Sequence, residues 1–171
     1  MVTDAATGSA DADDLVDRVR AIVGGVPDPE IPVITLADLG VLRDVTRRGD
    51  SLVVLLTPTY TGCPATAAIQ MAVEAALLDA GIDNARVETV LSPAWTTDDI
   101  TADGREKLRV YGIAPPEHAE STHLFGEQHV TCPRCRSRAT VQISEFGSTA
   151  CKALWRCKAC REPFDYFKCH R

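Results

Sequence analysis

The fold is decided by residues 51–80, which read SLVVLLTPTYTGCPATAAIQMAVEAALLDA. After Ser51 the first residues are uniformly apolar, so we expect a strand that is buried on both faces and central in its sheet. Two prolines and a glycine between Thr57 and Pro64 end this strand. The alanine-rich stretch from Ala65 to Ala80 then predicts a helix. The segment is therefore a strand, loop and helix unit, which is typical of a domain that combines helices with a sheet.

Further elements extend this unit in both directions. We expect a helix at Asp13–Gly25, a hairpin of strands at Val41–Arg47 and Ser51–Thr57, a strand at Ala85–Leu91 and a short helix from Thr97 to about Tyr111. Three prolines between Val26 and Pro32 exclude a helix there and fix an extended loop. The predicted fold class is α/β or α+β, with a small mixed sheet, flanking helices and a C-terminal zinc ribbon. The expected parts are a disordered leader (1–12), the main domain (13–113), a linker (114–128) and the ribbon (129–171).

Two cysteine pairs define the ribbon. Cys132-Pro133-Arg134-Cys135 and Cys157-Lys158-Ala159-Cys160 stand 21 residues apart, a spacing typical of zinc ribbons. A module of this size generally needs a metal or another covalent constraint to fold. We therefore assign Cys132, Cys135, Cys157 and Cys160 as ligands of a structural zinc ion, with a single iron ion as the alternative. Strands are expected around Arg138–Ser144, Lys152–Arg156 and Pro163–Lys168.

The charge of the chain is unevenly distributed. Its 171 residues carry a net charge of -6, but residues 129–171 contain nine Lys or Arg against three Asp or Glu. A basic ribbon can attract an acidic partner, or the acidic remainder of its own chain. The chain contains no apolar run long enough for a membrane span, and its start does not read as a signal peptide. With seven cysteines, mostly in metal-type pairs, we expect a reducing, cytoplasmic location.

Cys63 is the candidate reactive residue. It lies where the buried strand passes into the helix, with Pro64 suited to the first helical position, and unpaired helix N–H groups favour the thiolate form. Asp28 and Glu30, in the loop stiffened by prolines, would add hard oxygen ligands beside this soft sulfur, a combination that iron or an iron–sulfur species accepts. The alternatives are a small buried cysteine and acids that cap backbone or face solvent. One thiolate cannot hold a cluster, because clusters normally take about four ligands.

Three residues near the end of the chain lie outside the zinc set. Cys151, Cys169 and His170 are predicted to form a second metal or cluster site if the ribbon sheet brings them together. The alternative is two ordinary small residues and a solvated terminal histidine.

Several motifs resemble known families. Asp28-Pro29-Glu30-Ile31-Pro32, Asp38-Leu39-Gly40-Val41 and Thr61-Gly62-Cys63-Pro64 resemble the iron–sulfur assembly domain family that includes SufT, over residues 13–113. Together with Ser144–Lys152 and Phe164–His170, nearly the whole chain resembles the PaaD family of phenylacetate degradation. The resemblance implies a chain that accompanies phenylacetyl-CoA epoxidase, a multicomponent diiron monooxygenase. Its oxygenase and iron–sulfur reductase subunits would be the clients. The family's reactive cysteine corresponds to Cys63, and its acidic loop to Asp28 and Glu30.

The preferred function is a non-catalytic maturation factor, in which Cys63 handles a transient iron–sulfur cluster or iron while the ribbon docks the client. A structural adaptor of the epoxidase without cluster handling is the first alternative. A ribbon that binds nucleic acid is a remote alternative, disfavoured by the acidic main domain. No catalytic residue is assigned, because a thiol enzyme needs a base near Cys63 and the first 117 residues contain no histidine. The sequence leaves open whether the chain forms a homodimer.

Overall fold

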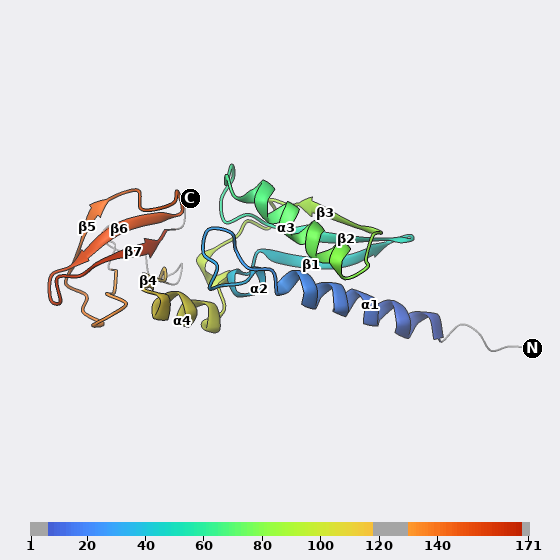
Figure 1. Ribbon diagram of the computed structural model, residues 1–171, viewed down its shortest axis with the longest axis horizontal. Coiled ribbons are helices and arrows are strands. Elements are labelled where there is room, and N and C mark those ends of the chain that lie inside the picture. Colours follow the sequence, from blue (N-terminus) through green and yellow to red (C-terminus); the bar gives the residue numbers. More distant parts are fainter. Residues whose placement is uncertain (1–6, 118–129, 169–171) are drawn as a thin grey trace, which may run out of the picture.

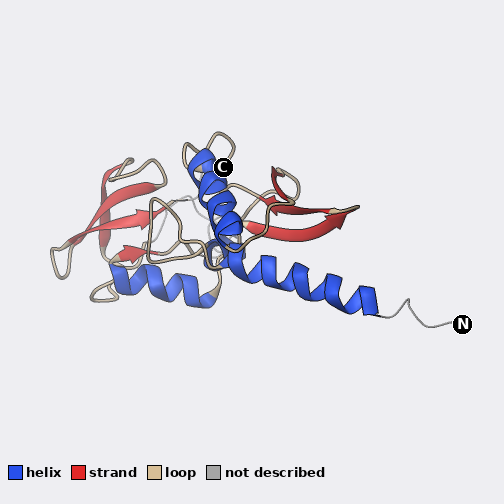
Figure 2. Ribbon diagram, turned by 45° about the vertical axis from the view of Figure 1, so that its right-hand side comes forward, coloured by secondary structure: helices blue, strands red, loops and turns tan. Residues whose placement is uncertain are grey.

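The computed structural model describes residues 7–117 and 130–168 (Figure 1). The main domain and the ribbon lie at opposite ends of an elongated molecule, and each has its own sheet (Figure 2). No helix in these ranges is long and apolar enough to cross a membrane. The predicted combination of helices, a small mixed sheet and a C-terminal ribbon is confirmed.

The first sheet has the order β1-β2-β3 and consists of β1 (Leu42–Arg48), β2 (Ser51–Leu56) and β3 (Ala85–Thr89). The hairpin of β1 and β2 is antiparallel, whereas β2 and β3 are parallel. The crossover between these parallel strands is helix α3 (Thr66–Asp79). The central, buried position predicted for the Ser51–Leu56 strand is confirmed, and Val54 in its middle is fully buried.

Helices α1 (Thr7–Gly24) and α3 cover the sheet (Figure 1). Val19 and Val23 of α1, Val54 of β2, and Val73 and Leu77 of α3 belong to one core cluster. Helix α1 begins at Thr7, earlier than the predicted Asp13. The other residues of the expected leader, 1–6, lie outside the described ranges, as does most of the expected linker.

The predicted helix from Thr97 to Tyr111 is wrong in one respect, because it is two elements. A 3-10 turn, η1 (Thr97–Asp99), is followed by extended backbone at Ile100 and then by α4 (Ala102–Tyr111). The break has a local cause, since the Thr101 hydroxyl caps α4 by accepting a hydrogen bond from the Gly104 amide at 2.9 Å.

A four-residue helix, α2 (Leu36–Leu39), was not predicted. Its capping box joins Thr35 and Asp38, each side chain accepting from the backbone N–H of the other. Gly40 ends it with φ of 67°, and a Cβ there would lie 2.2 Å from the carbonyl oxygen of Asp99. The absence of a side chain at Gly40 therefore lets the backbones of α2 and η1 approach closely.

The ribbon sheet has the order β4-β7-β6-β5, with strands β4 (Ile113–Ala114), β5 (Thr140–Ser144), β6 (Lys152–Cys157) and β7 (Pro163–Phe167). Strand β4 follows directly on α4 and pairs in parallel with β7. The rings of Trp95 and Phe167 meet edge to face, with centroids 6.3 Å apart. Phe167 and Cys151 both belong to the core cluster of the main domain. The ribbon is therefore docked on that domain.

Candidate functional site

Cys63 lies in the loop between the central strand and α3. Its N–H donates to the Tyr60 carbonyl at 3.3 Å, and its carbonyl accepts from the Thr66 N–H at 3.2 Å. Helix α3 begins at Thr66, with Ala65 as an N-cap residue that makes no side-chain cap. Pro64 thus lies in the turn before the helix, not at the predicted first helical position, because the bond between Cys63 and Thr66 closes a separate turn. The Cys63 side chain is half-buried.

Asp28 shapes the proline-rich loop. Its Oδ1 accepts from the Glu30 and Ile31 N–H groups at 2.9 and 2.8 Å, and the residue is 7% exposed. Burial raises the pKa of this carboxyl, while the two backbone hydrogen bonds act in the opposite direction. Asp28 therefore caps backbone, which was one of the alternatives that the sequence left open. Its carboxyl also lines a cavity that Cys63 shares.

Glu30 faces a residue of the ribbon. The Cys151 thiol donates to Glu30 Oε2 at 3.0 Å, and Thr149 Oγ1 lies 3.0 Å from the same sulfur. The buried Lys152 donates to the Glu30 carbonyl at 3.3 Å. Burial and the hydrogen bond to Glu30 raise the pKa of the Cys151 thiol to about 12. Cys151 is therefore a protonated donor near neutral pH.

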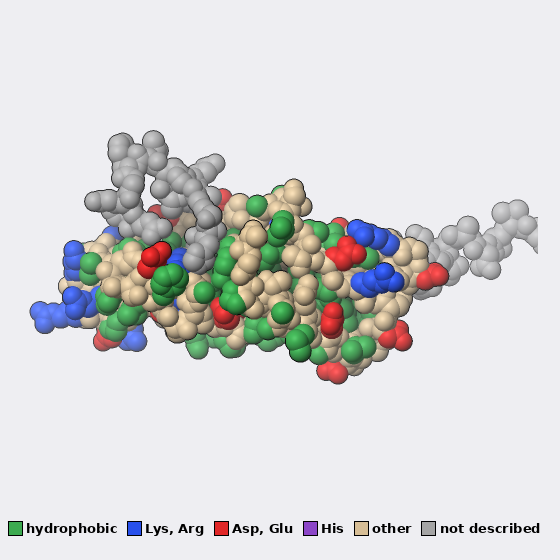
Figure 3. Space-filling view, turned by 90° about the horizontal axis from the view of Figure 1, so that it is seen from above, with side chains coloured by type: hydrophobic (Ala, Val, Ile, Leu, Met, Phe, Trp, Pro, Cys, Tyr) green, Lys and Arg blue, Asp and Glu red, His purple; other side chains and the backbone are tan. Residues whose placement is uncertain are grey.

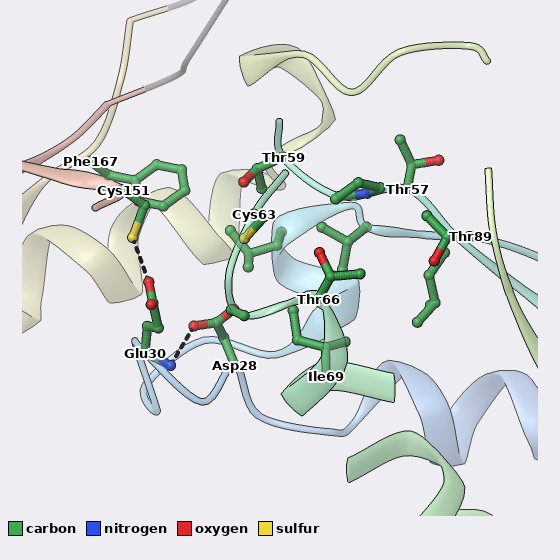
Figure 4. Close-up of a pocket in the computed structure, with 15 residues that line it drawn as sticks. Asp28, Glu30, Thr57, Thr59, Cys63, Thr66, Ile69, Thr89, Cys151 and Phe167 are labelled. Carbon is green, nitrogen blue, oxygen red and sulfur yellow. Dashed lines mark hydrogen bonds between the residues drawn. The ribbon is translucent and has the colours of Figure 1, made fainter. Parts of the chain in front are cut away.

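These groups meet at one cavity that opens to solvent (Figure 4). Cys63, Asp28 and Glu30, predicted as one site, all line it, and Cys151 joins them from the ribbon. Apolar side chains form much of the remaining wall, including Leu39, Val41, Leu56, Ile69 and Phe167. Sequence reasoning placed Cys151 with Cys169 and His170, which lie outside the described residues. The unpaired state of Cys151 in the sequence was the only signal of a role, and it did not indicate the partner.

Tyr60 is close to the same groups. Its pKa is raised by burial first and then by the charge of Cys63 and a hydrogen bond with it, with smaller effects from Cys151 and Glu30. The phenol therefore shares an electrostatic environment with both thiols. A negative charge in the cavity would be felt by all of these residues.

The four ribbon cysteines converge on a point. The sulfurs of Cys132, Cys135, Cys157 and Cys160 all lie within 4.8 Å of one another. Cys135 and Cys157 are 3.5 Å apart, and Cys132 and Cys160 are 3.8 Å apart. A tetrahedron with Zn–S bonds of about 2.3 Å has edges of about 3.8 Å, so the four sulfurs fit such a metal ion. Among the described residues, no other group of three or more Cys, His, Asp or Glu is this compact.

Both cysteine turns carry an arginine in left-handed conformation. Arg136 and Arg161 each follow the second cysteine of a pair, with φ of 64° and 68°. A residue other than glycine is disfavoured in this conformation by about 1–2 kcal/mol.

Basic side chains gather at the ribbon end of the molecule on the face drawn in Figure 3. The exposed basic residues of the ribbon include Arg134, Arg136, Arg138, Arg156, Lys158 and Arg161.

Known proteins resemble the chain in both parts. Residues 16–91 match the family described as iron-sulfur cluster assembly protein, and residues 116–168 match the PaaD zinc beta ribbon domain. An Escherichia coli K12 protein, named as a putative subunit of 1,2-phenylacetyl-CoA epoxidase, is 53% identical over 154 residues, which cover 90% of this chain and 93% of that protein. The chain belongs to the PaaD family. The resemblance inferred from the sequence motifs is thus confirmed.

A solved structure supports the fold of this PaaD-family chain. The crystal structure of a domain of unknown function, DUF59, from Bacillus anthracis has 24% identity and a TM-score of 0.52. The match covers 56% of this chain and 92% of that one. At this identity the likeness concerns the fold of the main domain alone.

Proposed function

We propose that this PaaD-family chain is an accessory maturation factor of the phenylacetyl-CoA epoxidase system, which assists iron–sulfur or iron-centre assembly in client subunits. The observation that carries the proposal is the shared cavity, in which the Cys63 thiol lies with the carboxyls of Asp28 and Glu30. The cavity belongs to a domain that matches the iron-sulfur cluster assembly protein family. The relative named as an epoxidase subunit supplies the choice of clients.

The chemistry of the cavity suits a cargo that must leave again. Thiolate is a soft ligand and carboxylate a hard one, and iron species accept both. A resident cluster normally takes about four protein ligands, more than the thiols of this cavity supply. The cavity is also open, so a client can approach Cys63. We infer that the client supplies the remaining ligands and receives the cargo.

The ribbon has a structural part in this function. We assign a zinc ion to Cys132, Cys135, Cys157 and Cys160, where it would hold the two cysteine turns together. Bound zinc contributes no reaction step. The exposed arginines around these turns offer a basic surface to an acidic client, in keeping with the net charge of the ribbon.

The proposal is tested by producing the oxygenase and iron–sulfur reductase subunits together with the wild-type chain, with Cys63→Ser or with Glu74→Gln. Glu74 is an exposed residue of α3 and serves as the matched control. We expect Cys63→Ser to keep its zinc and thermal stability, yet to leave the clients with less iron and little epoxidation of phenylacetyl-CoA. Full client iron and activity with Cys63→Ser would overturn the proposal.

A structural adaptor without cluster handling is the second candidate, and the exposed basic surface of the ribbon favours it. In that case Cys63→Ser is harmless, whereas reversing the charge of Arg134 and Arg136 abolishes association with the epoxidase. Association that weakens as salt rises would identify the contact as electrostatic.

A further inference from the structure

Cys151 carries a thiol, which can act as a metal ligand, and the proposed function gives this thiol no role. It precedes β6 of the ribbon, but its side chain lies in the core cluster of the main domain. It borders the cavity that Cys63 also lines (Figure 4). The cavity thus has one thiol from each part of the chain.

The surroundings of Cys151 differ from those of a cysteine that only fills space. Its sulfur has two oxygen partners at 3.0 Å, the Glu30 carboxylate and the Thr149 hydroxyl. Lys152 follows it in sequence, and its buried ammonium donates to the Glu30 backbone carbonyl and to the Ser148 hydroxyl, both at 3.3 Å. Burying the Lys152 ammonium costs free energy, which a packing role for Cys151 would not require. The polar groups instead make a thiol site with a proton acceptor already in contact.

We propose that Cys151 is the second thiol ligand of the iron-containing cargo held at Cys63, so that docking of the ribbon completes the binding site. The inference rests on the proposed function and names a further residue of the same site. When cargo binds, the S–H bond of Cys151 is replaced by an S–Fe bond. The proton passes by way of Glu30 Oε2 to solvent, which leaves the carboxylate charged, and no oxidation state changes.

The geometry favours a cluster over a single ion. Among the described residues, the four ribbon cysteines are the one group of three or more candidate ligands whose ligand atoms all lie within 4.8 Å of one another, so the cavity holds no such compact group. A mononuclear iron site needs its ligands that close, whereas a cluster with more than one iron accepts sulfurs that are further apart. Two thiols across an open cavity therefore suit a cluster that is completed by client or small thiols.

The test uses the full zinc-loaded chain, reconstituted without oxygen with ferrous iron and sulfide. Bound iron and acid-labile sulfide are measured after gel filtration for wild type, Cys63→Ser, Cys151→Ser and Glu74→Gln, the last as a control at an exposed position of α3. We expect Cys151→Ser and Cys63→Ser each to lower retained iron about tenfold or more, as expected when a ligand is removed. Glu74→Gln is expected to retain the wild-type amount. Zinc content and thermal denaturation report whether each variant is folded.

The outcomes separate the two proposals. Wild-type retention by Cys151→Ser with loss in Cys63→Ser overturns the role of Cys151 and leaves the proposed function intact. Retention by both variants, or no binding by wild type, contradicts cargo binding at this cavity altogether. If Cys151→Ser does not fold, the rates of cysteine alkylation in the wild-type chain, measured with and without cargo, serve as the test instead. Cargo should slow the labelling of both Cys63 and Cys151, and slowing at Cys63 alone overturns the inference.

Discussion

The Cys151 sulfur lies 3.0 Å from Oε2 of Glu30, although the two residues are 121 positions apart in the chain. Glu30 belongs to the proline-rich loop of the main domain, and Cys151 to the ribbon. The contact therefore exists only while the ribbon is docked. Since both residues line the cavity of Cys63, the state of the ribbon determines the composition of the candidate site.

Removing the charge of Glu30 should make Cys151 more reactive. Burial comes first in raising the pKa of this thiol to about 12, and the hydrogen bond to Glu30 comes second. In Glu30→Gln that pKa should fall, which increases the thiolate fraction at a given pH. We expect alkylation of Cys151 at pH 9 to accelerate several-fold, measured by mass spectrometry of the peptide that contains it.

The pH dependence gives this prediction a second check. In the wild type the alkylation rate of Cys151 should still rise above pH 10, because its pKa of about 12 has not been reached. In Glu30→Gln the curve should level off earlier, while Glu74→Gln, on the exposed face of α3, should match the wild type. Superimposed curves for Glu30→Gln and wild type would show that burial alone sets the reactivity of Cys151.

Asp28→Asn should distinguish the effect of the Asp28 charge on stability from its effect on iron binding. An asparagine oxygen can accept the same two bonds from the Glu30 and Ile31 N–H groups. The pKa of Asp28 is raised, chiefly by burial, so the folded state holds its proton more tightly than the unfolded chain. Its contribution to the free energy of unfolding therefore falls as pH rises above about 4. At pH 7 the neutral asparagine of Asp28→Asn avoids the free-energy cost of burying a charged carboxylate.

We accordingly expect Asp28→Asn to melt at the wild-type temperature or a few degrees higher, since 1 kcal/mol corresponds to about 2–4 °C at this size. It should nevertheless retain less iron in reconstitution if the carboxyl binds cargo. Asp83→Asn, at an exposed position, is the control for both measurements. A lower melting temperature for Asp28→Asn would mean that the charge itself is structural. Unchanged iron would mean that Asp28 only shapes the loop.

The sequence predicted what local patterns encode. The apolar run of Leu52–Leu56 and the alanine-rich helix that follows have strong periodic signals, and the paired cysteines of the ribbon have a characteristic spacing. The contact between Cys151 and Glu30 has no such signal. It depends on the two-residue strand Ile113–Ala114 pairing with β7, which is too short to predict from propensity. The break at Ile100 was missed because a threonine cap overrides the helical pattern.

Acid should weaken the link between α2 and α4. Lys107 Nζ donates to both carboxylate oxygens of Asp38, at 3.0 and 2.9 Å. Burial opposes ionisation of Asp38, but the hydrogen bonds from Lys107 and Thr35 lower its pKa overall. A lowered carboxyl pKa contributes stability above about pH 4, which is lost as pH falls through the folded-state value. Lys107→Met should therefore lower the free energy of unfolding at pH 7.

The same variant should approach the wild type as pH falls through the lowered pKa of Asp38, below which the carboxyl is protonated in both proteins. Urea denaturation at pH 7 and pH 3 measures this difference. Arg48→Met is the matched control, because it removes an exposed pair with Glu88 and should cost about 0.5 kcal/mol or less at either pH. An equal loss for Lys107→Met at both pH values would show that Lys107 acts through packing and not through its charge.

Removing the metal ion from the ribbon should also disturb the candidate site at the cavity. The four cysteine sulfurs hold both turns at one point, so a strong chelator or Cys132→Ser is expected to unfold the small sheet. The Glu30 carboxylate and carbonyl would then lose Cys151 and Lys152 as partners. Hydrogen exchange should quicken in β6 and β7 and also in the Asp28–Ile31 loop, while β2 stays protected in its own core. Exchange in that loop that is unaffected by metal loss would show that the main domain holds its half of the cavity without the ribbon.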